Sequence, residues 1–374
     1  MQIGIPRELK NREERVGADP NGVSELVNSG HTVIVEEDAG LGSGYTNQQY
    51  INAGAQIGAV GDVWNSEMII KVKEPIESEY QYFKPDQIIY TYLHLAANER
   101  LTAELLKKNV TGVAYETMVG PKGDLPLLFP MSEIAGRMAV QVGAHFLEEP
   151  HQGKGLLLSG VPGVRKGKVT IIGGGTVGMN AAQIAIGMGA DVTILDINAN
   201  RLAELERIFN GKIHTLMSNQ QNIAKSVKEA DLVVGAVLIP GAVTPKLVTE
   251  DMIKSMEPGS VVVDIPIDQG GLFETSIKAT THDDPVYLSY GVVHYTVANI
   301  PGAVPRTATE ALSSQTMPYA VKIANEGIVN ACANKTIATG VNTYHGSLTE
   351  AAVADSLKMP FADLREILLK PEFS

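Results

Sequence analysis

Residues 168–198, KVTIIGGGTVGMNAAQIAIGMGADVTILDIN, decide the fold of this chain. An apolar run from Val169 to Ile172 leads directly into Gly173, Gly175 and Gly178 at the G-x-G-x-x-G spacing. An alanine-rich helical pattern follows, and then a second apolar run that ends at Asp196. The order of strand, glycine turn, helix, strand and acid predicts a dinucleotide-binding βαβ unit.

Each glycine has a separate role in such a unit. Gly173 makes the turn, Gly175 lets the backbone approach a pyrophosphate, and Gly178 lets the helix pack against the strand. The helix N-terminus offers unpaired N–H groups and a partial positive charge to the phosphates. Asp196, 23 residues after Gly173, can accept hydrogen bonds from both ribose hydroxyls and would repel a 2′-phosphate. The nearest base, Arg201, lies in the following helix, so the sequence favours NAD(H) over NADP(H); the alternative cofactor FAD usually takes this motif near an N-terminus.

The composition excludes several classes of protein. A chain of 374 residues, 44% hydrophobic, can bury two ordinary cores. A net charge of −12 argues against nucleic acid or an anionic membrane as a partner. The single cysteine, Cys332, fits a reducing compartment, and the longest apolar run, residues 232–243, is too short to span a bilayer. The first residues do not read as a targeting segment, so we expect a soluble, cytoplasmic protein.

Strand and helix patterns alternate along the chain, which predicts mainly parallel sheets. We predict an α/β fold of two Rossmann-like domains, each a mainly parallel sheet flanked by helices, with a cleft between them. Residues 1–130 and 305–374 would form a discontinuous substrate domain, and residues 131–304 the NAD-binding domain. A helix is expected over residues 245–256, and the run 292–297 is predicted to be the last strand.

Ligands of parallel sheets gather at the carboxyl ends of the strands, and four polar residues follow predicted strands. Arg15 lies in a charged loop after the first strand, where a solvated arginine is the alternative interpretation. Lys73 follows the apolar run 68–72, and His94 follows IIYTYL, where it could equally be a structural histidine. Asp268 precedes two glycines and could simply cap a turn.

Several motifs, in order, resemble those of the alanine dehydrogenases. They are GIPRELKNREERV (4–16), KVKEP (71–75), YLHLA (92–96), PMSEIAGR (130–137), SGVPGV (159–164), IIGGGTVG (171–178), DQGG (268–271) and VANIPGAVPRT (297–307). The resemblance extends from residue 1 to about residue 358. Proton-translocating transhydrogenase α subunits and saccharopine dehydrogenases share parts of this pattern.

The resemblance implies NAD-dependent, reversible oxidative deamination of L-alanine to pyruvate and ammonium, in a protein that is usually hexameric. It assigns substrate binding to Arg15 and Lys73, acid/base catalysis to His94, and a second catalytic role to Asp268. The positions that match the family's cofactor site are Ser132, Gly173, Gly175, Thr176, Val177, Gly178, Asp196, Arg201, Ser218, Val237, Leu238, Ile265, Pro266, Ile267, Asp268, Val297, Ala298, Asn299 and Ile300.

No metal site is predicted. Some family members place a divalent metal between an acid and a histidine in the C-terminal helix, but the aligned positions here are Lys322 and Glu326. His282, His294 and His345 lack a regular ligand spacing.

The residue types agree with this chemistry. A guanidinium and an ammonium can hold the carboxylate of a small amino acid. An imidazole can give and take protons near neutral pH, and Asp268 could hold the attacking water or the substrate nitrogen. Two other classes stay open: a hydride-transferring domain with another acceptor, as in transhydrogenase, and a non-catalytic NAD-binding sensor.

Overall fold

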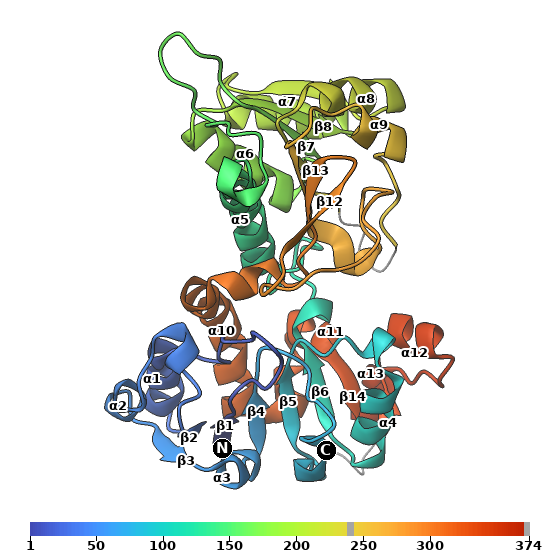
Figure 1. Ribbon diagram of the computed structural model, residues 1–374. Helices are drawn as coiled ribbons and strands as arrows, with labels where there is room; N and C mark the ends of the chain where they lie inside the picture. The colour runs from blue at the N-terminus through green and yellow to red at the C-terminus, as the bar shows by residue number, and fades with distance from the viewer. Residues whose placement is uncertain (238–242, 370–374) are drawn as a thin grey trace. The chain divides into compact units, whose positions relative to one another are not determined.

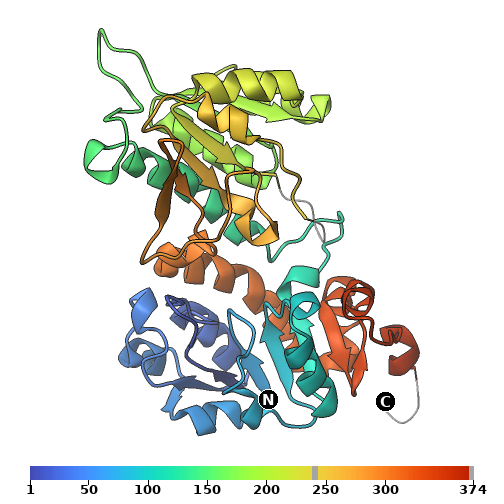
Figure 2. The ribbon, with the colours of Figure 1, turned by 45° about the vertical axis from the view of Figure 1, so that its right-hand side comes forward.

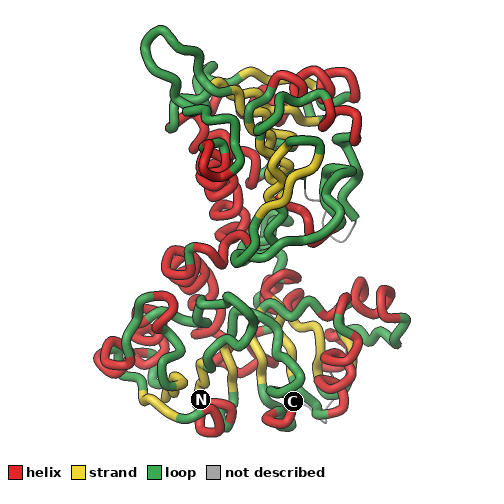
Figure 3. The backbone as a smooth tube through the Cα atoms, viewed as in Figure 1, coloured by secondary structure: helices red, strands yellow, loops and turns green. Residues whose placement is uncertain are grey.

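The computed structural model describes residues 1–237 and 243–369. The chain forms two compact units, one made of Met1–Met131 with Val304–Ser374 and the other of Ser132–Ala303. In each unit the strands lie between layers of helices (Figures 2 and 3). Two Rossmann-like α/β units with mainly parallel sheets are therefore confirmed. Within the described residues, no helix is both long and apolar enough to cross a membrane.

The first unit contains an eight-stranded sheet (lower part of Figure 1). The strand order is β15-β14-β6-β5-β4-β1-β2-β3, and the six strands from β6 to β3 are parallel. The antiparallel strand β14 extends this sheet beside β6. The strands are β1 (Gln2–Ile5), β2 (Thr32–Glu36), β3 (Gln56–Gly58), β4 (Met68–Ile70), β5 (Ile88–Thr91), β6 (Thr111–Ala114), β14 (Val341–Tyr344) and β15 (Ser347–Leu348).

Both faces of this sheet are covered, because successive side chains of a strand point to opposite faces. Met68 and Ile70 belong to one apolar core and Ile69 to another. The first core includes residues of α1 and α10, which pack against each other. The helices of this unit are α1 (Pro20–Asn28), α2 (Asn47–Asn52), α3 (Val60–Trp64), α4 (Glu99–Lys107), α10 (Pro305–Ala331), α11 (Lys335–Gly340), α12 (Ala351–Leu357) and α13 (Leu364–Leu368).

The second unit contains a seven-stranded sheet in the order β12-β13-β11-β10-β7-β8-β9 (upper part of Figure 1). All its strands are parallel except β12. Its strands are β7 (Lys168–Ile172), β8 (Asp191–Asp196), β9 (His214–Met217), β10 (Leu232–Gly235), β11 (Val261–Asp264), β12 (Val286–Ser289) and β13 (Val292–Tyr295). Its helices are α5 (Phe129–Phe146), which starts just before this unit, α6 (Thr176–Gly187), α7 (Ala199–Ile208), α8 (Gln220–Glu229) and α9 (Glu250–Lys254).

Two expected elements differ from the structure. The helix predicted over residues 245–256 is limited to α9, because the backbone of Leu247 and Val248 pairs with Leu272 and Thr249 caps the helix. The run at residues 292–297 is not the last strand, since β14 and β15 follow it. These two strands contain four and two residues, too few for an alternating pattern to stand out.

Candidate active site

The carboxyl ends of the parallel strands of the first sheet lie at one edge, where the loops after β1, β4, β5 and β6 meet. The loop after β1 contains Arg15 and lines a cavity of about 460 Å³ together with Asp38, Ala39, Leu41 and Gly42. The segment after β4 contains Lys73 and Glu74, and the turn after β5 contains His94. The structure therefore brings the three predicted residues of this unit to one edge of its sheet.

Arg15 is buried, with 2% of its side chain exposed, and is held by an acid of its own loop. Its Nε and Nη2 donate to the two carboxylate oxygens of Glu13, both at 2.6 Å, and its Nη1 lies 3.1 Å from the sulfur of Met131. Burial opposes the charged form, but the hydrogen bonds to Glu13 raise the pKa of Arg15. The solvated-arginine alternative is therefore wrong, and one of the two forks of the guanidinium is occupied by Glu13.

Lys73 is half-buried beside these charges. Unlike Arg15 and Lys71, it has no acidic side chain within ion-pair distance among the described residues. Among the described residues, its Nζ forms no ion pair and donates no hydrogen bond to a side chain. Burial and the nearby Arg15 hold the pKa of Lys73 below its ordinary value. Glu13 and Glu74 act on this ammonium only from beyond ion-pair distance, so the anionic group of a ligand that contacts it would be stabilised.

His94 occupies a strained turn. Its φ of 49° is in the left-handed region, which costs a residue other than glycine about 1–3 kcal/mol. Glu116, directly after β6, offsets this cost by accepting the backbone N–H of His94 at 2.6 Å and that of Leu93 at 3.1 Å. The His94 ring is 46% exposed and stacks on Tyr92, with the ring centroids 6.0 Å apart.

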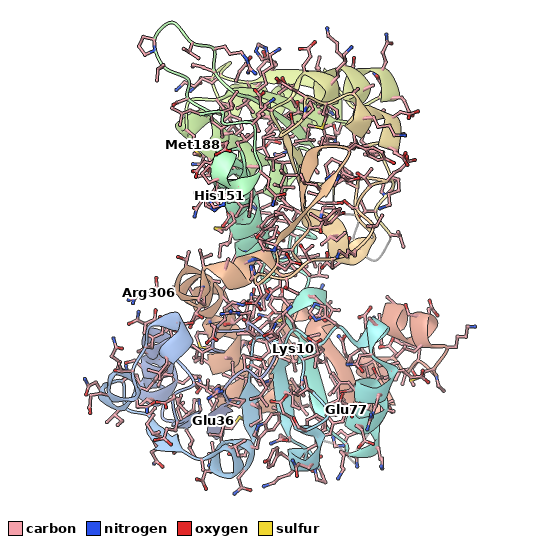
Figure 4. The ribbon with its side chains drawn as sticks, in the orientation of Figure 1. Lys10, Glu36, Glu77, His151, Met188 and Arg306 are labelled. Carbon is pink, nitrogen blue, oxygen red and sulfur yellow. The ribbon has the colours of Figure 1, made fainter. Side chains whose placement is uncertain are left out.

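Glu74 orients the His94 ring, a contact that the sequence did not predict. His94 Nδ1 lies 3.3 Å from Glu74 Oε2, while the other oxygen of Glu74 pairs with Lys10 (labelled in Figure 4). Burial opposes the ionised form of Glu74, but the bonds from His94 and Lys10 lower its pKa to about 2. If Nδ1 carries the proton towards this carboxylate, Nε2 is the basic nitrogen.

A buried ion cluster supports the strand end that carries Lys73. Lys71 pairs with Glu79 at 2.9 Å and with Glu8 at 3.3 Å, and all three side chains are at most 3% exposed. Glu8 also accepts the backbone N–H groups of Val72 and Lys73, at 2.6 and 3.3 Å. Glu8, Glu13, Glu74 and Glu116 were missed because sequence reasoning singled out bases and histidines. Two of the four, Glu13 and Glu74, adjoin or lie within two residues of a predicted site residue, which is the signal that could have identified them.

The glycine turn of the second unit has the predicted backbone. Gly173 has a φ of 104° and Gly178 is so tightly packed that a Cβ there would lie 1.8 Å from the Gly173 oxygen. A Cβ on Gly175, by contrast, would meet no atom within 4 Å. Gly175 is the N-cap of α6, and no side chain caps this helix. The space in front of the helix N-terminus therefore fits an anionic group such as a pyrophosphate.

Asp196, the last residue of β8, faces this turn. Its carboxylate accepts the N–H of Gly174 at 2.7 Å and that of Asn198 at 2.8 Å. Arg201, in α7, also reaches the turn, because its Nε donates to the Gly174 oxygen at 2.7 Å while its Nη1 pairs with Glu204. The Arg201 side chain is therefore held by hydrogen bonds to the glycine turn and to Glu204.

Most of the other predicted cofactor positions of this unit follow its parallel strands at the same edge. Ser218 follows β9, and its backbone N–H donates to the backbone oxygen of Asp196 at 2.9 Å. Asp268 is exposed and lies in a 3-10 helix (Ile265–Gln269) after β11. Ser132 lies near the start of α5, which packs closely on α6 at Gly136. Leu238 lies outside the described residues. The remaining positions at this edge are Thr176 and Val177 in α6, Val237 after β10, Ile265, Pro266 and Ile267 with Asp268, and Val297, Ala298, Asn299 and Ile300 after β13.

Comparison with known proteins accounts for both units. Residues 4–135 match the family described as Alanine dehydrogenase/PNT, N-terminal domain, and residues 139–351 match Alanine dehydrogenase/PNT, C-terminal domain. The chain belongs to this alanine dehydrogenase/PNT family. The resemblance seen in the motifs is therefore confirmed.

Relatives in the alanine dehydrogenase/PNT family match along the whole chain. The alanine dehydrogenase of Geobacillus stearothermophilus is 58% identical over 371 residues, which are 98% of this chain and 100% of the relative. Alanine dehydrogenase 2 of Staphylococcus aureus (strain USA300) is 58% identical over 370 residues, with the same coverage. A solved structure named L-alanine dehydrogenase matches with a TM-score of 0.94 and 49% identity, over 96% of this chain and 99% of that one. A transhydrogenase from Sinorhizobium meliloti, 24% identical, shares the fold with a TM-score of 0.83, over 94% of this chain and 100% of that one.

The C-terminal helix α10 holds an ion pair at the two positions that some family members are expected to use for a metal. Lys322 Nζ lies 2.6 Å from Glu326 Oε1, one helical turn away. An ammonium at this position repels a divalent cation, so these two residues do not fit such a site.

Proposed function

We propose that this chain catalyses the NAD-dependent, reversible oxidative deamination of L-alanine to pyruvate and ammonium. The observation that carries the proposal is Lys73, a half-buried ammonium without an acid partner among the described residues, at the same sheet edge as Arg15 and His94. Family membership and the 58% identity to alanine dehydrogenases support the same reaction.

The charges at the sheet edge suit a monoanionic carboxylate. Arg15 and Lys73 contribute two positive charges, and Glu13 neutralises one of them through its paired hydrogen bonds to Arg15. The remaining positive charge matches one substrate carboxylate. In this proposal Glu13 orients Arg15, and Lys73 supplies the counter-charge that the substrate needs.

His94 is the proposed acid/base catalyst and Glu74 its positioning residue. With Nδ1 held by Glu74, the basic Nε2 can take a proton from the substrate ammonium, release it to solvent, and then take a second proton from the attacking water. Glu74 stabilises the imidazolium that forms in either step, as a carboxylate next to a catalytic histidine does in other enzymes. Asp268 is the proposed second catalytic residue, which orients the water or the reacting nitrogen.

The glycine-turn unit is the proposed NAD-binding domain, and the discontinuous unit the proposed substrate domain. The open space at Gly175 and the uncapped α6 N-terminus fit the pyrophosphate, and Asp196 fits the adenosine ribose. When bound, NAD would supply the hydride acceptor for Cα of the amino acid, and water would then hydrolyse the protonated imine that results. The residues proposed to hold it are the cofactor positions located above, together with Leu238.

The decisive experiment follows NADH absorbance with the purified chain. L-alanine with NAD, and pyruvate with ammonium and NADH, should give turnover, whereas larger amino acids and 2-hydroxy acids should give little. NADP should support a much lower kcat/KM, because Asp196 would face its 2′-phosphate. NADH binding without turnover of any amino acid would contradict the proposal and favour an NAD sensor.

We also propose that the protein is a cytoplasmic homohexamer. In the second unit, residues 156–166 project as a loop (Figure 1) whose Leu157, Val161 and Val164 are 63%, 55% and 63% exposed. Exposed apolar side chains on a projecting loop are typical of surfaces that pack against another subunit. Sedimentation equilibrium would test the proposal: six chains per particle are expected, and a monomer at micromolar concentration would refute it.

A further inference from the structure

Three potential metal ligands converge where α5 ends in the second unit. His145 lies in the last turn of α5, His151 ends the following 3-10 helix (Glu149–His151), and Glu148 lies between them. One donor atom from each residue lies within 4.8 Å of the other two. We propose that His145, Glu148 and His151 bind one Zn²⁺ ion, independently of the proposed catalytic function.

The two histidine donors lie at similar distances from one carboxylate oxygen. His145 Nδ1 lies 3.9 Å and His151 Nε2 3.8 Å from the same oxygen, Glu148 Oε2. Ligand atoms at zinc bond lengths, about 2.0–2.2 Å from a tetrahedral ion, are roughly 3.4 Å apart. The three donors lie within 4.8 Å of one another, so rotations of these surface side chains would have to bring them together to complete the site.

The backbone already holds the three residues in place. His145 accepts the N–H of Glu148 at 3.2 Å, and Glu148 accepts the N–H groups of His151 and Gly153, both at 3.1 Å. Phe146 packs against both imidazoles, with ring centroids 5.2 Å from that of His145 and 5.9 Å from that of His151. Binding therefore requires little ordering of the backbone, which reduces its entropic cost.

The donor set and its surroundings favour zinc over magnesium or calcium. Two imidazole nitrogens and one carboxylate oxygen suit Zn²⁺, whereas the harder ions prefer oxygen ligands. In the described part of the chain, Glu148 has no lysine or arginine partner, and its ion-pair partners are the two histidines. The imidazole centroids are 3.8 Å apart, which is closer than two imidazoles on one tetrahedral ion, so the two rings must rotate away from each other when the ion binds.

The site is at the surface, where water can complete the coordination. The side chains of His145, Glu148 and His151 are 51%, 58% and 37% exposed (His151 is labelled in Figure 4). A bound ion would join the end of α5 to the 3-10 helix that follows it. We therefore assign the site a structural role in this connection, since none of its residues belongs to the proposed catalytic machinery.

The test is a zinc titration of the full-length protein at neutral pH, by calorimetry, with Co²⁺ absorption as a second probe of tetrahedral coordination. The wild type should bind one Zn²⁺ per chain. His145→Gln and His151→Gln should each weaken this binding by roughly tenfold or more, at least the loss found when a supporting residue around a metal is removed. His214→Gln is the matched control, because His214 is also an exposed histidine next to an acid, Asp191.

Amide hydrogen exchange provides a second readout that does not depend on activity. Zinc should slow exchange over residues 145–153 in the wild type and in His214→Gln, but not in His145→Gln or His151→Gln. Equal zinc affinity in all four proteins, or no zinc binding by the wild type, would overturn the assignment. Because the substituted side chains are exposed, unchanged melting temperatures without metal should show that each variant folds.

Discussion

At the residue scale, the unexpected result is that glutamate side chains hold Arg15 and His94, two of the predicted site residues, in position. Glu74 holds the His94 ring, and Glu116 holds the strained His94 backbone. His94→Ala should lower kcat by roughly 10²–10⁴-fold and leave NADH binding unchanged, because a general acid/base is lost. Glu74→Gln should lower kcat less, also with NADH affinity intact.

The control for Glu74→Gln is Glu77→Gln. Glu77 lies in the same loop as Glu74, is exposed, and pairs with Arg100 of α4. This variant should keep wild-type kcat. A His94→Ala enzyme with near-normal kcat from pH 6 to 10 would return His94 to the structural role that its sequence also allowed.

Lys73 provides a cleaner test of carboxylate binding than Arg15. Replacing Arg15 would break its buried ion pair with Glu13, which typically costs about 3–5 kcal/mol of stability and would obscure the effect on substrate binding. Lys73→Met should raise the KM for pyruvate by roughly 10- to 100-fold, the value of a charged hydrogen bond, and leave the KM for NADH unchanged. Lys107→Met, at an exposed lysine of α4, should change neither constant. An unchanged KM for pyruvate in Lys73→Met would exclude contact with the substrate.

At the scale of elements, helix α6 contains two glycines with opposite requirements. A Cβ at Gly178 would lie 1.8 Å from a backbone oxygen, whereas a Cβ at the exposed Gly187 would meet no atom within 4 Å. Gly178→Ala should therefore open the glycine turn, abolish NADH binding and lower the melting temperature. Gly187→Ala should retain NADH binding and gain about 0.5–1 kcal/mol of stability, because alanine favours a helix over glycine. NADH fluorescence and thermal unfolding would distinguish the two outcomes.

Asp231 fixes the amino end of the second sheet. Its carboxylate, 1% exposed, accepts from Arg165 at 2.7 Å, from Lys154 at 2.5 Å and from the N–H of Lys168 at 2.7 Å. Burial opposes its ionised form, but these partners lower the pKa of Asp231 from 3.8 to about 2. Because the pKa is lower in the folded state, its stabilisation is present above pH 3.8 and is lost as the pH falls towards 2.

Asp231→Asn should therefore reduce the free energy of unfolding by about 2 kcal/mol at neutral pH, from a shift of nearly two pKa units. The difference from the wild type should diminish between pH 4 and 2. Urea unfolding at several pH values would measure it, and Asp251→Asn, at an exposed residue of α9, is the control. A difference that does not depend on pH would contradict the assigned pKa.

At the scale of the whole molecule, the two units differ in how the chain builds them. The second unit is continuous in sequence, whereas the first combines both ends of the chain. The core of the first unit contains Leu312, Met317 and Ile323 of α10. A fragment of residues 125–303 should therefore unfold cooperatively and bind NADH without oxidising L-alanine. A fragment of residues 1–131 should show no cooperative transition, because it lacks α10 and β14. Circular dichroism and NADH fluorescence would test both fragments.

The sequence by itself determined the glycine-turn unit, because its requirements are local. The apolar run at residues 169–172, the positive φ at Gly173 and the close packing at Gly178 depend on residues near one another in the chain. The same local patterns located most strands and placed Arg15, Lys73 and His94 after strand ends. The cleft between the two units, which the sequence analysis also predicted, stays a prediction.

The tertiary structure alone decided which charges meet. Glu13 occupies one fork of Arg15, Lys73 forms no ion pair within the described part of the chain, and Glu116 holds the turn of His94. Glu116 and His94 are 22 residues apart and belong to loops after different strands. Such contacts depend on which strands are neighbours in the sheet, and that order depends on packing over the whole unit. For the same physical reason, β14 could be placed beside β6 only in the folded chain, where residues more than 200 positions apart share one sheet.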